Sequence, residues 1–564
     1  MRAHGSTVNA SALTADGCFA DSAAETAAPA TRSKLAIMSA RGDDSLHRVQ
    51  FTPDLVVRAL SHDLGRTVIR VMDGAMISAA AFRDATSRYC QALQSLGLPV
   101  GTRIGILSRN RPEVLYLTAA CLLNRYVMVP LHPIGSLDDH LYVIEDAGAG
   151  VLAFDADNFA ARAADIQART ARLGHLLSLG AGAHGTDLNG LAARFLPAPL
   201  TTPEISGDGV YRLSYSGGTT GRPKAIVNTH RMGLALLTIQ LAEWEWPSDI
   251  RQLVCAPLSH AGAAMFLPTL LRGGSLLLLP AFDPVEAMSA IERHRITCVL
   301  LVPTMIYALL DHPRLSEFDL SSLETVFYGA ALMSPTRLRQ AIERFGPIFF
   351  QFYGQSEAPM SLSILRRADH RMDDPVRLAS CGRPVPWVDV ALLDDKNRRV
   401  PIGTPGEICA RGPLVMGGYH NKPEQTAEAL AGGWLHTGDV AVEDGDGFLR
   451  IVDRKKDMIV TGGFNVYPRE IEDVLSAHPL VANCAVVGVP DPHWGEAVKA
   501  VVVLRPGAAP CAEELIALVR ERKGPVQAPK TINFVDAIPL TALGKPDKKA
   551  LRARYADQLR GHAR

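Results

Sequence analysis

The 564-residue sequence predicts an α/β protein with a large N-terminal domain of several subdomains and a small α+β C-terminal domain. Three observations lead to this prediction. Apolar segments typical of buried strands alternate with helical patterns through most of the chain, which favours layered α/β sheets. After about residue 385 short strands follow one another between Gly, Pro and Asp turns, which indicates a small β subdomain. A very polar segment, 453–457, then precedes a compact unit of about a hundred residues.

The individual elements are expected as follows. In the alternating part, strands are expected at 104–107, 126–130, 151–155, 298–302 and 325–328, and a helix at 111–124. The β subdomain is expected to use strands at 389–393, 406–410 and 447–452. In the C-terminal unit we expect helices at 468–476, which begins with a proline, and at 513–522, and strands at 481–489, 498–504 and 531–535.

These elements divide the chain into three parts. Residues 1–45 are expected to be a disordered leader, because they are rich in Ala, Ser and Thr and lack a secretory h-region. Residues 46–453 are expected to form the N-terminal domain, and residues 454–564 the C-terminal domain.

The composition excludes several classes of protein. Lys+Arg and Asp+Glu both total 58, which argues against a nucleic-acid-binding protein, and no apolar run is long enough for a transmembrane helix. The nine cysteines form no CxxC pair and no regular spacing, which disfavours a disulfide framework or a zinc site. A cytoplasmic enzyme with buried, reduced thiols fits these numbers.

The strongest local motif is the segment YSGGTTGRPK at 215–224, which lies between two strand-like segments. Its glycines let backbone N–H groups approach a polyphosphate, and its hydroxyls and lysine add donors and charge. A Walker A loop is excluded by the spacing and by Pro223 directly before the lysine. The segment therefore predicts a different kind of phosphate-binding loop, formed by Ser216, Gly217, Gly218, Thr219, Thr220, Gly221 and Lys224.

This loop resembles that of the ANL superfamily of adenylate-forming enzymes, which includes acyl-CoA synthetases, adenylation domains and luciferases. Further motifs of that superfamily follow in the same order, over roughly residues 50–555. They are YGAA at 328–331, QFYGQSE at 351–357, GEI at 406–408, WLHTGD at 434–439, DR at 453–454, GGFNVYP at 462–468 and LGK at 543–545. The ordered set makes the resemblance specific.

The resemblance implies a nucleotide site for ATP and Mg²⁺. Tyr353 would stack on adenine, Asp439 and Arg454 would bind the ribose hydroxyls, and Glu357 would bind the metal. Ser356 would bond the α-phosphate or the acyl oxygen. The remaining residues around the base would be Gly329, Ala330, Ala331, Gln351, Phe352 and Gly354.

The resemblance also implies a two-step reaction, in which an acid is adenylated and the acyl group then passes to coenzyme A. Lys545 would bridge the carboxylate and the α-phosphate, and Glu357, His260 and Thr220 would complete the catalytic set. The C-terminal domain would be mobile and would rotate about Lys456 between the steps. Gly462 and Gly463 would line the path of the thiol.

Four positions depart from the usual pattern and put the fine geometry of nucleotide binding in doubt. They are Gly217, Ala225, Leu332 and Ser356. No charged or metal-binding residue is lost.

The segment 257–263 matches the region that carries an aromatic or histidine gate in acyl- and aryl-CoA ligases. It contains no carboxylate for a substrate ammonium, which disfavours an amino acid. His260 is therefore a candidate gate, with a satisfied buried histidine as the alternative. The acyl pocket, assigned to His260, Ala261, Gly262, Gly329 and Met360, suits a fatty, aryl or alicyclic acid and offers no distal charge partner.

Two alternatives to a CoA ligase stay open. One is an adenylating enzyme that loads a separate carrier protein, since no carrier motif follows the C-terminal domain. The other is a non-catalytic nucleotide-binding or scaffold protein, against which the retention of five residues argues: Lys224, Glu357, Asp439, Arg454 and Lys545. Lys548, Lys549, Arg552 and Arg554 are expected to form a solvated helix face.

Overall fold

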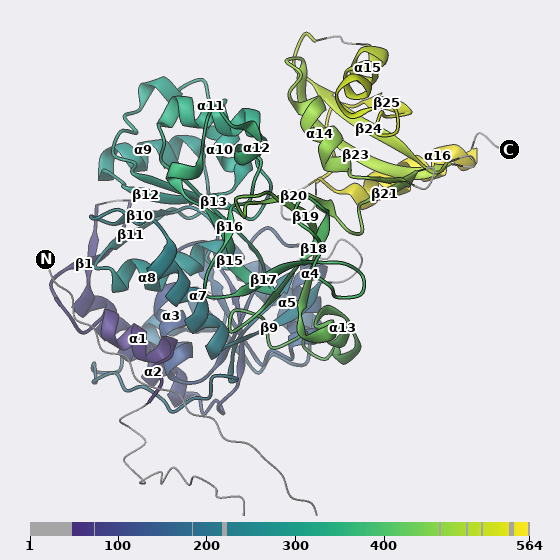
Figure 1. Cartoon of the computed structure of the whole chain (residues 1–564). Helices are drawn as coiled ribbons and strands as arrows, with labels where there is room; N and C mark the ends of the chain where they lie inside the picture. The colour runs from purple at the N-terminus through teal and green to yellow at the C-terminus, as the bar shows by residue number, and fades with distance from the viewer. Residues whose placement is uncertain are drawn as a thin grey trace, which may run out of the picture. The chain divides into compact units, whose positions relative to one another are not determined.

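The computed structural model describes residues 48–72, 74–182, 184–216, 223–461, 464–491, 494–508, 511–540 and 546–561. Residues 50–564 form one compact unit that contains four β-sheets with helices packed on them (Figure 1). The mixed α/β architecture, with a large N-terminal part, a small β sheet and a smaller C-terminal part, confirms the predicted fold class. The expected leader lies outside the described residues.

A seven-stranded sheet has the order β7-β6-β5-β3-β4-β8-β9. Its strands are parallel except for the β8–β9 hairpin at one edge. The strands are β3 (Arg103–Leu107), β4 (Val127–Pro130), β5 (Val151–Asp155), β6 (His175–Leu179), β7 (Thr186–Asp187), β8 (Val210–Ser216) and β9 (Lys224–Thr229).

A nine-stranded sheet has the order β16-β15-β14-β13-β12-β10-β11-β1-β2. The strands from β14 to β1 run parallel, and antiparallel strands close both edges. They are β1 (Thr67–Arg70), β2 (Met76–Ser78), β10 (Arg251–Val254), β11 (Ser275–Leu278), β12 (Cys298–Leu301), β13 (Thr325–Gly329), β14 (Phe349–Gln355), β15 (Ala358–Leu365) and β16 (Arg383–Pro384).

Two smaller sheets follow in the chain. The first is antiparallel and contains β17 (Asp389–Leu393), β18 (Gly406–Arg411), β19 (Leu435–Glu443) and β20 (Leu449–Arg454). The second belongs to the C-terminal part and contains β21 (Ile459–Thr461), β22 (Phe464–Val466), β23 (Val481–Asp491), β24 (Gly495–Leu504) and β25 (Thr531–Phe534).

Many of the helices begin at residues that favour a helix start. Proline occupies the first turn of α3, α9, α10, α11 and α14, where its missing N–H costs no hydrogen bond. Ser136 and Asp139 form a capping box at α4. The helices are α1 (Thr52–Ala59), α2 (Ala79–Ser95), α3 (Pro112–Leu123), α4 (Leu137–Ala147), α5 (Ala156–Arg169), α6 (Leu188–Ala192), α7 (His230–Glu243), α8 (Phe266–Leu271), α9 (Pro284–His294), α10 (Pro303–Leu310), α11 (Pro335–Phe345), α12 (Pro375–Leu378), α13 (Pro423–Ala429), α14 (Pro468–Ser476), α15 (Ala512–Lys523) and α16 (Lys548–Gly561).

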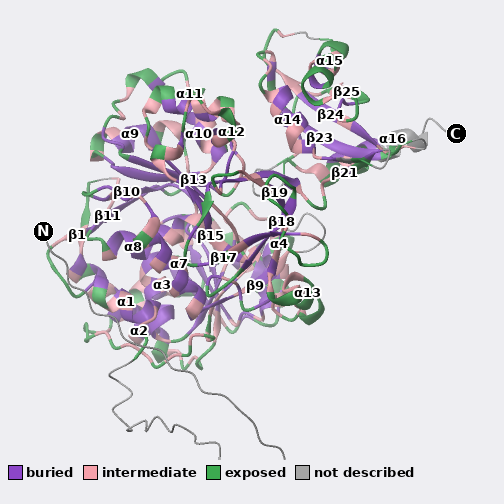
Figure 2. Ribbon diagram, viewed as in Figure 1, coloured by how far each residue is buried: buried purple, intermediate pink, exposed green. Residues whose placement is uncertain are grey.

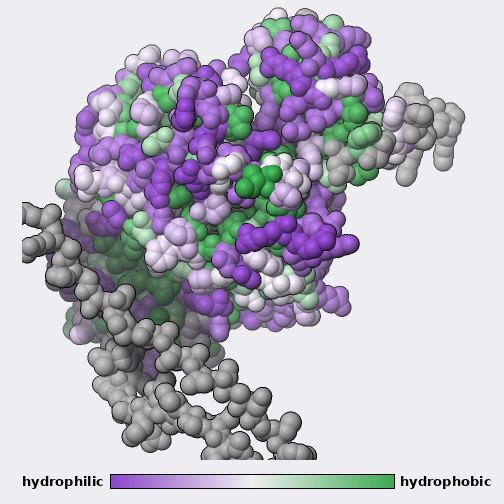
Figure 3. All heavy atoms as spheres, viewed as in Figure 1, coloured by the Kyte–Doolittle hydropathy of each residue, from purple (hydrophilic) through white to green (hydrophobic). Residues whose placement is uncertain are grey.

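The strands of the large sheets are largely buried, as the purple strands in Figure 2 show. Parallel strands that are covered on both faces must be apolar throughout, and β5, β11, β12 and β13 are buried along their whole length. The face shown in Figure 3 is largely hydrophilic, with apolar atoms gathered near its middle. In the described part of the chain, no helix has the length and apolarity needed to cross a membrane. All eight cysteines described are free, and seven are buried.

Candidate active site

Two antiparallel hairpins, one at the edge of each large sheet, carry most of the predicted site residues. Strand β8 pairs in parallel with β4 and returns as β9, and β14 pairs in parallel with β13 and returns as β15. Ser216 ends β8 and pairs with Lys224 at the start of β9, so these two residues bracket the predicted phosphate loop. The connection after β14 carries Ser356 and Glu357.

Two glycines let these strands approach closely. A Cβ atom on Gly329 would lie 2.3 Å from the carbonyl oxygen of Phe352, and one on Gly354 would lie 2.4 Å from the backbone nitrogen of Met360. Neither distance is tolerable for a side-chain carbon, so glycine is required where β13 meets β14 and where the β14–β15 hairpin closes. The neighbouring Ala330 has a positive φ of 63°.

Two assignments in the predicted acyl pocket need correction. Gly262 and Gly329 are buried and do not belong to the described wall of the cavity. A Cβ on Gly262 would lie 2.3 Å from the carbonyl oxygen of Ala256, because the short helix at 261–265 packs directly on that backbone. His260, Ala261 and Met360 do line the cavity.

The three residues predicted to bind adenosine lie together. The Tyr353 hydroxyl donates to Asp439 Oδ2 at 2.7 Å, and Arg454 Nε lies 3.0 Å from Asp439 Oδ1. Asp439 and Arg454 are cross-strand partners in β19 and β20, so the sheet register fixes the pair. Burial and the Asp439 charge raise the pKa of Tyr353 well above its usual value, which keeps the phenol a hydrogen-bond donor.

Glu357 and Lys224 meet at a tyrosine that sequence reasoning missed. The Tyr419 hydroxyl donates to Glu357 Oε1 at 2.8 Å, and Lys224 Nζ lies 4.8 Å from the centre of the Tyr419 ring. The second carboxylate oxygen of Glu357 accepts no hydrogen bond from the described residues. A carboxylate oxygen is a suitable ligand for a hard cation such as Mg²⁺, so Glu357 fits a metal-binding role. Tyr419 carries no motif-like signal in the sequence.

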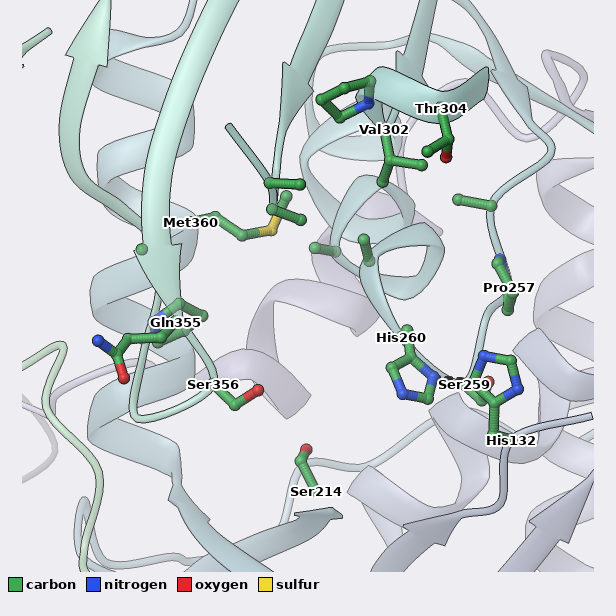
Figure 4. Close-up of a pocket in the computed structure, with 18 of the residues that line it drawn as sticks. His132, Ser214, Pro257, Ser259, His260, Val302, Thr304, Gln355, Ser356 and Met360 are labelled. Atoms are coloured by element: carbon green, nitrogen blue, oxygen red, sulfur yellow. Dashed lines mark hydrogen bonds between the residues drawn. The ribbon is translucent and has the colours of Figure 1, made fainter. Parts of the chain in front are cut away.

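His260 lies beside a second histidine at the cavity wall (Figure 4). The ring centroids of His260 and His132 are 4.6 Å apart, with an angle of 68° between the ring planes, and the Ser259 hydroxyl lies 3.0 Å from His260 Nδ1. Burial, followed by the charges of His132 and Arg212, lowers the pKa of His260 to about 3. The imidazole is therefore neutral at any working pH, which suits contact with an apolar acid.

Arg212 is a second residue that sequence reasoning missed. It lines the same cavity, donates through Nε to Ser214 Oγ at 3.0 Å and through Nη2 to the Ser259 carbonyl at 2.5 Å. It makes no ion pair with a carboxylate among the described residues. The alternation of β8 offered a signal, because Arg212 and Ser214 share one face of a strand whose other face carries Tyr211, Leu213 and Tyr215.

One cavity of about 2410 Å³ joins these groups. Its wall includes Gln351, Phe352, Tyr353, Gly354, Ser356, Ala330, Ala331, Asp439, Arg454 and Lys456. It also continues among α1, α3, α7 and α8, because Val56, Leu122, Leu236 and Phe266 line it there. The volume exceeds that of ordinary ligand pockets of about 300–1,000 Å³, so the cavity has room for two substrates at once.

The other predicted residues lie outside the described part of the chain. They are Gly217, Gly218, Thr219, Thr220 and Gly221 of the phosphate loop, Gly462 and Gly463 of the thiol path, and Lys545. Their roles stay predictions. Lys456 is present, and burial lowers the pKa of its ammonium group.

The expected solvated face of the last helix is wrong for Lys548 and Arg552. Lys548 Nζ lies 2.9 Å from Glu472 Oε1, and the two side chains are only 17% and 10% exposed. Arg552 Nη2 lies 2.8 Å from Asp457 Oδ1. The prediction failed because a charged helix does not reveal which of its cations face buried acids on another element; Lys549 is exposed as expected.

A cluster of possible metal ligands lies near the ribose residues. Glu407, Cys409 and His436 have ligand atoms within 4.8 Å of one another. Glu407 already accepts from Gly438 N at 2.9 Å, and its other oxygen lies 3.1 Å from His436 Nδ1 and 3.3 Å from Lys455 Nζ. This cluster therefore positions the turn before Asp439 rather than offering open ligands.

Comparison with known proteins agrees with this geometry. The profile of the AMP-binding enzyme family matches residues 57–420, which is more than half of the chain, and the profile of the AMP-binding enzyme C-terminal domain matches residues 470–545. The chain belongs to the AMP-binding enzyme family. The resemblance to adenylate-forming enzymes inferred from the motifs is thereby confirmed.

Individual members of the AMP-binding enzyme family cover nearly the whole chain. A medium/long-chain-fatty-acid–CoA ligase, FadD8 of Mycobacterium tuberculosis, is 51% identical over 514 residues, covering 89% of both chains. A feruloyl-CoA synthase of an Amycolatopsis species is 40% identical over 487 residues, covering 86% of this chain and 94% of its own. The solved structure of the amide bond synthetase McbA of Marinactinospora thermotolerans has a TM-score of 0.82 at 35% identity, covering 89% of this chain and 99% of its own.

Proposed function

We propose that this protein is an AMP-forming acid–CoA ligase that activates a hydrophobic carboxylic acid with MgATP and transfers the acyl group to coenzyme A. The observation that carries the proposal is the single cavity on which Asp439, Arg454, Glu357 and Lys224 converge. A diol-binding carboxylate, a metal-binding carboxylate and two cations are the groups that ATP requires. A neutral His260 beside them suits an uncharged acyl chain.

Each residue has a definite task in the adenylation step. Asp439 and Arg454 hold the ribose, Tyr353 stacks on adenine, and Lys224 binds phosphate oxygens. Glu357 would hold Mg²⁺, which offsets phosphate charge when it is bound. Alignment of the carboxylate oxygen with the α-phosphorus then permits displacement of pyrophosphate, and Lys545 is proposed to stabilise the charge that develops.

The apolar arm of the cavity favours a fatty acid over a compact aryl acid. Helix α1 contacts α3, α7 and α8, and these four helices supply Val56, Leu122, Leu236 and Phe266 to the wall of the arm. An arm that continues past His260 among four helices suits an extended chain, whereas a single ring would leave much apolar wall without a partner. FadD8, a medium/long-chain-fatty-acid–CoA ligase at 51% identity, supports the same choice.

The test is pyrophosphate release with MgATP over a panel of fatty, aryl and alicyclic acids, with and without CoA. We expect CoA-dependent turnover that is highest with medium or long fatty acids and that yields acyl-CoA. If the acyl-adenylate forms but no acyl-CoA is produced, the acceptor in the proposal would have to be a carrier protein and not CoA. Absence of pyrophosphate release with every acid would refute the enzymatic proposal.

A further inference from the structure

Ser214 and its neighbours form a small polar group at the wall of the cavity, on the same strand, β8, that leads into the predicted phosphate loop. Ser214 Oγ accepts two hydrogen bonds, from Arg212 Nε at 3.0 Å and from Asn228 Nδ2 at 3.1 Å. The amide of Asn228 also donates to the Ile226 carbonyl at 3.0 Å, which fixes its nitrogen on the side that faces Ser214. A serine oxygen has two acceptor sites, and both are therefore filled.

The hydroxyl proton of Ser214 must then point elsewhere. No acceptor for it lies within hydrogen-bond distance in the described residues. Figure 4 shows the Ser214 hydroxyl directed into the open space that Ser356 and His260 also face. The hydroxyl is thus a donor that is oriented in advance, because its alternatives are blocked.

The charges around this donor favour an anion. Arg212 is desolvated, and among the described residues its guanidinium donates hydrogen bonds to the Ser214 hydroxyl and the Ser259 carbonyl and makes no ion pair with a carboxylate. A buried cation without a carboxylate partner attracts a negative group strongly in a low dielectric. The space in front of Ser214 therefore suits a negatively charged oxygen.

We propose that the Ser214 hydroxyl binds the carboxylate of the acid substrate before adenylation, with Arg212 and Asn228 as the positioning residues. The inference rests on the proposed function and adds to it the group that recognises the reacting end of the acid. The cation serves the carboxylate end of the acid, so the prediction of a pocket without a distal charge partner stays unchanged. The site should therefore bind an ionised carboxylic acid more tightly than the amide or the alcohol of the same chain length.

The experiment compares variants in pyrophosphate exchange with dodecanoic acid, or with the best acid of the panel if that acid is not turned over. A hydrogen bond to a charged group predicts that Ser214→Ala raises the KM for the acid about 10- to 100-fold. The KM for ATP stays within about threefold, and Ser214→Thr, which keeps the hydroxyl, restores most of the loss. Ser322→Ala, which removes a buried hydroxyl bonded to the Ile296 carbonyl, is the matched control and leaves both constants unchanged.

A second pair of variants tests the charge. Arg212→Gln lowers affinity for dodecanoate but not for dodecanamide, measured as a competitive inhibitor, so the ratio of the two affinities falls at least tenfold. Asn228→Asp places a carboxylate beside Arg212 and lowers the same ratio, which loss of stability alone would not do. Arg212→Lys keeps the charge and retains part of the preference.

Other results would overturn the inference. A rise in the KM for ATP alone would assign Ser214 to the α-phosphate, and a rise only in the KM for CoA would assign it to the thiol. An unchanged ratio of acid to amide affinity in Arg212→Gln would show that the charge of Arg212 does not contribute to binding of the carboxylate. Failure of the wild-type protein to activate any acid would instead contradict the proposed function, so the two failures are distinguishable.

Discussion

Replacing Lys548 by methionine should destabilise the C-terminal part of the protein far more than the same change at Lys549. Lys548 Nζ lies 2.9 Å from Glu472 Oε1, and the same oxygen accepts from Val486 N at 2.8 Å. Although burial opposes the charge of Lys548, Glu472 and Asp453 raise its pKa overall. Methionine would leave both acids without this cation.

The magnitude follows from the burial of the pair. Breaking a buried ion pair by removal of one partner costs roughly 3–5 kcal/mol. Because the Lys548 side chain is 17% exposed, some solvent screening applies, and we expect about 2–4 kcal/mol. Lys549 is exposed, so its replacement should cost no more than about 0.5 kcal/mol.

Hydrogen exchange followed by mass spectrometry measures this difference without requiring a single unfolding transition. Amides of β23 and β24 should exchange roughly 30- to 1,000-fold faster in Lys548→Met than in wild type, and at nearly wild-type rates in Lys549→Met. Adding Glu472→Gln to Lys548→Met should recover part of the loss, because it removes the unpaired charge. Equal exchange rates in the two lysine variants would refute the assignment of a buried pair.

Three further predictions concern single carboxylates and one histidine. Burial raises the pKa of Asp453 to about 6, above an unfolded value of ~3.9. Ionisation of Asp453 therefore lowers the free energy of unfolding by up to about 3 kcal/mol; this loss is absent below pH ~4 and complete above pH ~6. The wild type should lose this stability as the pH rises from 4 to 6, and Asp453→Asn should not. Hydrogen exchange or denaturation at the two pH values measures the difference. Asp439→Asn should raise the KM for ATP about tenfold or more without changing that for the acid, because an amide replaces one acceptor oxygen by a donor. The low pKa of His260, about 3, predicts that His260 contributes no inflection near pH 6.5 to the pH profile of kcat/KM. An inflection near pH 6.5 that is present in the wild type and absent in His260→Gln would contradict this prediction.

The sequence was sufficient for the fold class and for most element positions, because periodicity and helix-start residues are local signals. The strands β5 and β17 and the helix α14 have the bounds that the pattern predicted. The strands β23 and β24 extend beyond their predicted ends, since pairing with a neighbouring strand lengthens a strand past its apolar run. Which strands become neighbours is not encoded locally.

The same limit explains the outcome at the site. Tyr353, Asp439 and Arg454 were predicted from motifs that are far apart in the sequence, and the structure brings them within hydrogen-bond distance. Tyr419 was missed because its importance comes only from contacts across the fold, with Glu357 and Lys224. A residue that acts through its contact with another side chain can be predicted only when its neighbours in the folded protein are known.

The two acids of the nucleotide site share a feature that bears on how the site works. Each accepts a hydrogen bond from a tyrosine hydroxyl, Asp439 from Tyr353 and Glu357 from Tyr419. A carboxylate held in this way has its orientation fixed before a ligand arrives, so less reorganisation accompanies binding of the ribose or of a cation. At the acid end, Arg212 and Asn228 fix a hydroxyl in the same manner. The arrangement places fixed acceptors where ATP brings hydroxyls and metal, and a fixed donor where the acid brings negative charge, so the polarity of each end matches the reactant that we assign to it.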